Sequence, residues 1–208
     1  MASDWLRDGP PDAPISFVFA HGAGAPMDSP FMSEVAKGLG TRGVRVVRFE
    51  FPYMAARRTG KKGPPDRMPA LAASFTAVVE ALRAERGGPV AVGGKSMGGR
   101  VASHLADDVE AAAFVAFGYP FRPPGKTAWR PVTHLSAMKT PGLIVQGTRD
   151  PFGGREELAV DALAPEIAWM EDGDHDFAPR KRSGRTTEQN WAEAVDRAAA
   201  FLLTRAAG

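Results

Sequence analysis

The chain has 208 residues and a formal net charge of +2, enough length for one domain with a substantial core. It contains no cysteine, which excludes disulfide bonds, thiolate metal ligands and a cysteine nucleophile. The amino-terminal MASDWLRDGPPDAP lacks the residue order of a secretory signal, and the longest uncharged stretch, 111–121, is too short to span a bilayer. We therefore expect a single domain over residues 1–208, in the cytoplasm and without membrane contact.

Strand-like and helix-like stretches alternate along the chain, which is the pattern of a parallel sheet covered on both faces. Apolar runs predict strands at residues 15–20, 44–51, 90–94, 111–117, 142–147 and 166–170. Apolar residues at helical spacing predict helices at residues 30–41, 69–86, 97–107, 154–163 and 187–204. The expected fold class is α/β, a minimal doubly wound parallel sheet of about six strands. Loops at the carboxyl ends of such strands build the functional site.

The run GGKSMGG, residues 93–99, follows a predicted strand and precedes a predicted helix. A phosphate-binding loop would require a glycine five residues before Gly94, where the chain has Pro89. The same run fits G-x-S-x-G, the sharp strand-to-helix turn that exposes a nucleophilic serine between two small residues, here Gly94 and Gly98. We interpret Ser96 as a nucleophile, with an ordinary glycine-rich turn as the alternative.

A serine nucleophile needs a base, and the base needs an orienting carboxylate. Asp150 follows the strand predicted at 142–147, and His175 follows the strand predicted at 166–170. The order Ser96, Asp150, His175 is that of α/β-hydrolases. Asp150 has an alternative role as a turn residue before a proline. The chain has three other histidines, which do not follow the last strand: His21, His104 and His134.

Acyl transfer also requires donors for a developing oxyanion. The backbone N–H of Met97, directly after the nucleophile, is one expected donor. The second is expected from the loop HGAGAP after the first predicted strand. Its small residues allow a substrate to approach the backbone closely, and Ala23 is our choice, with Gly22 and Gly24 as rivals.

The acidic residues around His175, in DGDHD, resemble a calcium-binding loop. However, Phe177 stands where that loop requires glycine, and Ser183 stands where it requires glutamate. We therefore expect no metal, and a serine relay needs no cofactor.

Several motifs taken together resemble the small α/β-hydrolases grouped with the testis-expressed and NSL-complex-subunit-three proteins, near the dienelactone hydrolases. They are FVFAHGAGAPMDSPFM, GKSMGGR, GYPFRPPGK, LIVQGTRDPFG and DGDHDF. The resemblance covers nearly the whole chain. It implies an α/β-hydrolase fold without the family's first two strands and a triad of Ser96, Asp150 and His175. It implies no substrate, and some relatives resemble complex subunits more than enzymes.

The segment between the strands predicted at 111–117 and 142–147 is too short for a helical cap domain, so we expect an open site. Tyr119, Phe121 and Trp129 in this segment are candidates for an apolar wall, although loop aromatics can equally pack the loop down.

Two basic runs leave the same edge of the predicted sheet: RRTGKK, which contains Arg57 and Arg58, and RKRSGR at residues 180–185. They could attract an anionic substrate, and the alternative is that both are solvated loops. Neither run has the interleaved aromatic residues typical of nucleic-acid binding.

These observations predict a serine hydrolase of a small-molecule carboxylic ester or thioester, without a cofactor, acting through an acyl-enzyme intermediate. We expect a monomer or homodimer that binds neither nucleic acid nor membrane. The alternative is a catalytically silent interaction module with a hydrolase fold.

Overall fold

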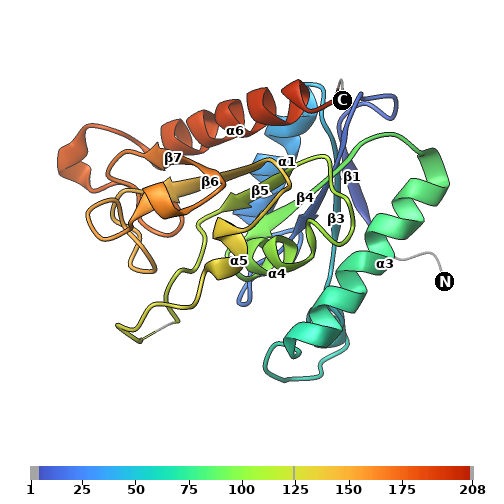
Figure 1. The fold of residues 1–208 in the computed structure, drawn as a ribbon, viewed down its shortest axis with the longest axis horizontal. Helices are drawn as coiled ribbons and strands as arrows, with labels where there is room; N and C mark the ends of the chain where they lie inside the picture. The colour runs from blue at the N-terminus through green and yellow to red at the C-terminus, as the bar shows by residue number, and fades with distance from the viewer. Residues whose placement is uncertain (1–4, 124, 207–208) are drawn as a thin grey trace.

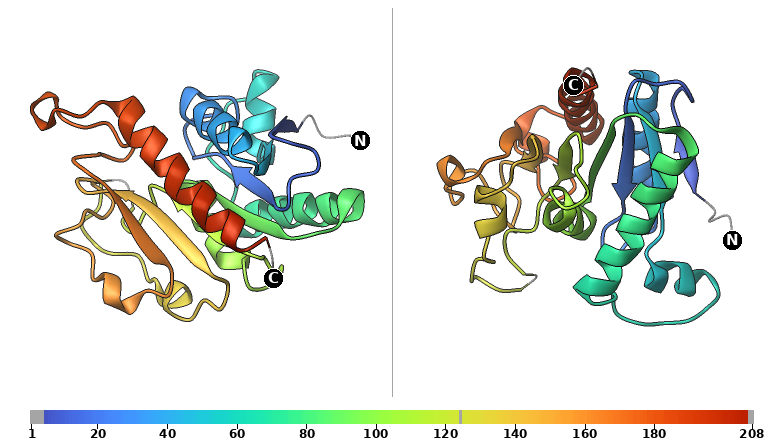
Figure 2. Two further views of the ribbon diagram at one scale, coloured as in Figure 1. Left: turned by 90° about the horizontal axis from the view of Figure 1, so that it is seen from above. Right: turned by 45° about the vertical axis from the view of Figure 1, so that its right-hand side comes forward.

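A twisted sheet divides the molecule into two helical layers (Figures 1 and 2). The computed structural model describes residues 5–123 and 125–206. The strands follow one another in space in the order β1-β3-β2-β4-β5-β6-β7. Their bounds are β1 (Leu6–Asp8), β2 (Ser16–Ala20), β3 (Arg45–Phe49), β4 (Val90–Lys95), β5 (Phe114–Phe117), β6 (Gly142–Gly147) and β7 (Glu166–Met170). All neighbouring pairs are parallel except β1 with β3.

Helices connect the parallel strands and cover both faces of the sheet. They are α1 (Pro30–Thr41), α2 (Pro52–Arg58), α3 (Met68–Arg86), α4 (Met97–Leu105), α5 (Thr133–Ser136) and α6 (Thr187–Thr204), with 3-10 turns at Val160–Ala162 and Lys181–Ser183. Apolar side chains of α1 and α6 form one core with the sheet, and those of α3 and α4 form the other. Because β2, β4, β5 and β6 are buried along their whole length, their sequences are nearly continuous apolar runs. No helix within residues 5–123 and 125–206 has the length and hydropathy of a bilayer-spanning segment.

The structure confirms the doubly wound α/β architecture and corrects several elements. β1 is a seventh, antiparallel strand at the sheet edge that the sequence analysis does not predict. The helix predicted at 154–163 is wrong, because this segment forms turns and one 3-10 turn. None of its residues between 155 and 163 is buried, so a helix there would lack a packed face to stabilise it. α2 was also missed, since it is short and its apolar content lies in only two buried side chains, Tyr53 and Met54.

Ser96 lies on a strained turn where β4 meets α4. Its φ of 50° and ψ of −112° are outside the usual helical and strand regions, a conformation that costs about 1–3 kcal/mol. A Cβ atom on Gly94 would lie 2.5 Å from the carbonyl oxygen of Ala20, and one on Gly98 would lie 2.4 Å from the same oxygen. The first turn of α4 therefore packs directly on the end of β2, and only glycine fits two positions before and two positions after Ser96.

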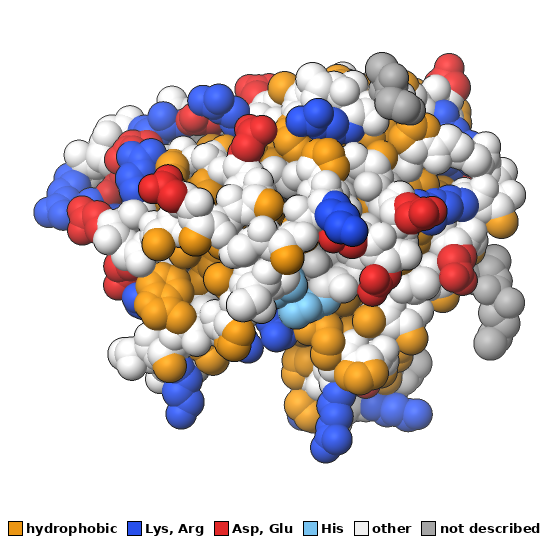
Figure 3. All heavy atoms as spheres, viewed as in Figure 1, with side chains coloured by type: hydrophobic (Ala, Val, Ile, Leu, Met, Phe, Trp, Pro, Cys, Tyr) orange, Lys and Arg blue, Asp and Glu red, His pale blue; other side chains and the backbone are white. Residues whose placement is uncertain are grey.

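A polar cluster joins α4 to α5 on the face seen in Figure 3, where histidine side chains reach the surface. The rings of His104 and His134 stack with their centroids 3.8 Å apart. His134 Nε2 lies 3.1 Å from Ser103 Oγ and 3.2 Å from the Tyr119 hydroxyl. Burial, with the nearby His104 and Arg100, lowers the pKa of His134 to about 4. His134 in the folded protein therefore stays unprotonated at pH values just below 6.5, where the histidine of an unfolded chain is already protonated.

We expect Gly98→Ala to lower the free energy of unfolding by about 1–3 kcal/mol or more, because the added methyl group overlaps the backbone of β2. Thermal unfolding followed by circular dichroism measures the change. Gly63→Ala is the matched control, since an added Cβ there meets nothing within 4 Å. An unchanged Tm for Gly98→Ala would contradict the close contact.

The lowered pKa of His134 predicts a loss of stability in acid. Between about pH 6.5 and 4 the unfolded chain binds the proton and the folded chain does not, so the free energy of unfolding falls as pH falls. His134→Gln should reduce the difference in Tm between pH 7 and pH 5 by a few degrees, corresponding to about 1–2 kcal/mol. Equal pH slopes in the wild type and the variant would show that His134 does not titrate differently on folding.

Candidate active site

The loops that leave β4, β6 and β7 bring Ser96, Asp150 and His175 to one rim of the sheet. His175 Nδ1 lies 2.8 Å from Asp150 Oδ2. Ser96 and His175 line the same pocket, which has a volume of about 320 Å³. Three side chains distant along the sequence are thus assembled at the carboxyl ends of parallel strands, where α/β folds place their sites.

The carboxylate of Asp150 is buried and held by several donors. Its Oδ1 accepts the backbone N–H of Phe152 at 2.8 Å, and its Oδ2 accepts the side-chain amide of Gln146 at 3.0 Å as well as the imidazole. Because a carboxylate can only accept, Nδ1 of His175 carries the proton and Nε2 is left with a lone pair. An imidazole in this tautomer is suited to act as a base at Nε2.

Gln146 is a positioning residue that the sequence analysis missed. Its side chain is fully buried at the end of β6, and its amide also bonds the backbone of Tyr119 and Gly153. The available signal was a lone amide inside the otherwise apolar run LIVQG. A polar side chain in such a buried strand must find partners, and here one of them is the carboxylate of Asp150.

Neither Ser96 Oγ nor His175 Nε2 has a hydrogen-bond partner among the described residues. Ser96 and His175 both line the pocket, and the ring of Phe152 packs edge-on against the imidazole with centroids 4.5 Å apart. Hydrogen bonds between a nucleophile and its base often tighten only once substrate is bound. The arrangement therefore leaves the hydroxyl and the imidazole nitrogen available to a reacting group.

The loop that carries His175 is anchored from two elements. Lys95, at the end of β4, donates from Nζ to the carbonyl oxygen of His175 at 2.7 Å and pairs with Asp176 at 3.1 Å. Asn190 of α6 is fully buried and donates to backbone carbonyls at both ends of the loop. Burial lowers the pKa of Lys95, and the carboxylate of Asp176 opposes that shift.

The acidic residues beside His175 are engaged within the protein. Asp172 pairs with Arg149 and with Arg180, and the bond to Arg180 lowers the pKa of Asp172 to about 2. Asp174 accepts two backbone N–H groups of its own turn. Their carboxylates thus stabilise the loop that presents the imidazole.

The predicted oxyanion loop lies against the nucleophile. Gly22, Ala23 and Gly24 line the pocket together with Ser96. A Cβ atom on Gly22 would lie 3.8 Å from the Cβ of Ser96, so the loop backbone passes close to the hydroxyl. Met97 is the first residue of α4, where a backbone N–H has no partner within the helix.

Tyr119, Phe121 and Trp129, which the sequence suggested as an apolar wall, do not line this pocket. Tyr119 and Phe121 are fully buried in the core beside α4. Trp129 is 42% exposed and stacks with Arg122, whose guanidinium carbon lies 4.1 Å from the ring centroid. The aromatic walls of the pocket are instead Phe31 and Phe152.

Arg57 and Arg58, predicted to contact the substrate, do not line this pocket either. Arg58 pairs with Glu50 and Asp28, and these bonds raise its pKa. Arg57 donates to a backbone carbonyl at 2.7 Å, and its guanidinium lies 5.0 Å from the ring centroid of Tyr53. The carboxylates that neutralise Arg58 could not be located from the sequence.

Solved structures of hydrolases share this architecture. An α/β serine hydrolase without a lid from Xanthomonas campestris is 21% identical, with a TM-score of 0.68 over 93% of this chain and 88% of that one. An α/β serine hydrolase homologue from Coxiella burnetii is 21% identical, with a TM-score of 0.73 over 93% and 90%. Dienelactone hydrolase from Anabaena variabilis is 21% identical, with a TM-score of 0.72 over 96% and 90%. At these identities the likeness establishes the fold.

The family assignment comes from the sequence as a whole. No curated protein sequence matches the chain. A family model described as an alpha/beta hydrolase domain matches residues 13–203. This match runs from just before β2 to the last turn of α6, and it agrees with the mostly parallel sheet and the turn at Ser96. The chain therefore belongs to the α/β hydrolase family.

Proposed function

We propose that the protein is a serine hydrolase that cleaves a carboxylic ester or thioester through Ser96, His175 and Asp150. The observation that supports this most strongly is the bond between His175 Nδ1 and the buried Asp150, which leaves Nε2 unengaged in a residue that lines the same pocket as Ser96. The strained turn adds support, because a module without catalysis has no physical need to hold a serine in that conformation.

The proposed reaction has two acyl-transfer steps. Ser96 Oγ attacks the carbonyl carbon while His175 Nε2 takes the hydroxyl proton, and Asp150 stabilises the imidazolium. The tetrahedral intermediate expels the alcohol or thiol, which takes the proton from His175 and leaves an acyl ester on Ser96. Water then attacks this ester with His175 again as base, and the carboxylic acid leaves as Ser96 Oγ takes the proton back from His175. In both steps the N–H groups of Ala23 and Met97 stabilise the oxyanion.

The pocket favours a small, uncharged acyl group. Glycine, alanine, methionine and phenylalanine residues form most of its wall, and the charge of Lys95 is opposed by Asp176. Attraction of an anionic substrate by the basic runs has weaker support, since Arg58 and Arg180 are ion-paired within the protein. Between β5 and β6 the described residues contain one short helix, α5, so the site is open to bulky leaving groups.

We place the chain within the group of testis-expressed and NSL-complex-subunit-three hydrolases, near the dienelactone hydrolases. The motifs GKSMGGR and DGDHDF favour this placement, and the likeness to the cyanobacterial dienelactone hydrolase is compatible with it. A small-molecule ester or thioester remains the proposed substrate class.

Labelling with a fluorophosphonate probe, read by mass spectrometry, tests the proposed nucleophile. We expect covalent labelling at Ser96 in the wild type, and its loss in Ser96→Ala together with a fall of at least about 10³-fold in kcat on short p-nitrophenyl esters. Ser29→Ala is the matched control, because Ser29 is the other serine of the pocket and its hydroxyl makes no cap bond to α1. A folded wild type that is neither labelled nor active would contradict the proposal and favour a silent interaction module.

A further inference from the structure

The loop predicted to supply an oxyanion donor is held from its buried side by two side chains. The carbonyl oxygen of Gly22 lies 2.7 Å from Nδ1 of His21 and 3.3 Å from the hydroxyl of Tyr53. The same hydroxyl lies 3.0 Å from the carbonyl oxygen of Ala23. Neither His21 nor Tyr53 lines the pocket, and both are buried, so these bonds come from behind the loop.

The hydrogen bonds of His21 fix its tautomer. The backbone N–H of Phe51 donates to His21 Nε2 at 3.1 Å, so this nitrogen carries no proton and Nδ1 donates to Gly22. Burial lowers the pKa of His21, which keeps the ring neutral and preserves both bonds at neutral pH. The ring also packs against Phe51 and Tyr53, with centroids 5.1 Å and 5.9 Å away.

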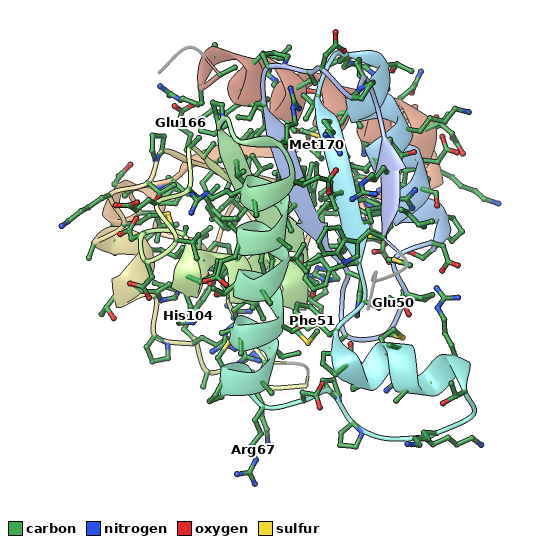
Figure 4. The ribbon with its side chains drawn as sticks, turned by 90° about the vertical axis from the view of Figure 1, so that its right-hand side faces the viewer. Glu50, Phe51, Arg67, His104, Glu166 and Met170 are labelled. Atoms are coloured by element: carbon green, nitrogen blue, oxygen red, sulfur yellow. The ribbon has the colours of Figure 1, made fainter. Side chains whose placement is uncertain are left out.

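Tyr53 lies in the first turn of α2, which begins shortly after the end of β3. Figure 4 shows Glu50 and Phe51 at that end of the strand, beside this helix. The backbone N–H of Tyr53 donates to Asp66 at 2.9 Å, and Arg57 covers the ring. Burial raises the pKa of Tyr53 to about 12, so the phenol remains a proton donor at neutral pH.

The planarity of the peptide bond determines the direction in which the amide N–H groups of this loop point. In a planar trans peptide the C=O of one residue and the N–H of the next point in opposite directions. No peptide bond among the described residues is cis. With the carbonyls of Gly22 and Ala23 directed to the buried side, the N–H groups of Ala23 and Gly24 point the other way, toward the pocket that holds Ser96.

We propose that Tyr53 and His21 are positioning residues that hold the amide of Ala23 as an oxyanion donor, with the Gly24 amide beside it. The inference rests on the proposed hydrolase function. A loop of glycine and alanine has many accessible conformations, and a donor stabilises a transition state best when it needs no reorganisation. Tyr53 and His21 supply that rigidity from outside the pocket, so their loss should weaken transition-state binding and leave substrate binding nearly unchanged.

Tyr53→Phe tests this inference by removing a single oxygen atom. We expect kcat to fall roughly 10- to 100-fold while KM changes by less than about twofold, because the donor remains but is no longer held. The affinity for a phenylboronic acid, which forms a tetrahedral adduct with a serine, should fall by the same factor as kcat/KM. The affinity of the variant for the carboxylic acid product should stay close to that of the wild type.

The matched control is Tyr119→Phe, which alters the only other tyrosine of the chain. Its hydroxyl is also buried but bonds Ser103 and His134 and makes no bond to the loop, so we expect kcat and boronate affinity within about twofold of the wild type. An active wild type with unchanged Tyr53→Phe, or equal losses in both variants, would overturn this inference alone. A wild type without activity would overturn the proposed function and this inference with it.

Discussion

The contact between the first turn of α4 and the carboxyl ends of β2 and β4 determines where Ser96 can lie. Gly94 and Gly98 are required there, because a Cβ atom at either position would overlap the carbonyl oxygen of Ala20. The cores on both faces of the sheet hold these elements together. Their combined burial maintains a serine conformation that an isolated turn would avoid.

The same rim gathers loops that are each fixed by a buried polar side chain from a neighbouring element. Gln146 holds Asp150, Lys95 and Asn190 hold the His175 loop, and His21 with Tyr53 holds the loop of Gly22 and Ala23. Each anchor is satisfied by defined partners, so burying its polar group does not leave a donor or acceptor without a bond. Of these anchoring side chains, only Lys95 also lines the pocket.

Sequence patterns could predict the parts of this architecture that depend on local periodicity. The continuous apolar strands and the glycine spacing around Ser96 located the sheet, the rim and the loops that carry Asp150 and His175. The anchoring roles of Gln146 and Tyr53 were missed, because they depend on hydrogen bonds to residues far away in the chain. For the same reason Tyr119 and Phe121 were assigned to a pocket wall, although a loop aromatic lowers its free energy equally by packing into a core. The basic runs were also misinterpreted, since Arg58 pairs with Glu50 and Arg180 pairs with Asp172, each 8 residues earlier in the chain.

Few charged side chains line the pocket. Lys95, a buried side chain at the pocket, pairs with Asp176, and the buried Asp150 bonds His175. A crystal structure of the protein with a bound phenylboronic acid tests this account most directly. The account predicts boron bonded to Ser96 Oγ, one boronate oxygen within about 3 Å of the amide nitrogens of Ala23 and Met97, and His175 Nε2 within hydrogen-bond reach of the adduct. Boron bound elsewhere, or an adduct whose oxygens meet neither amide, would contradict it.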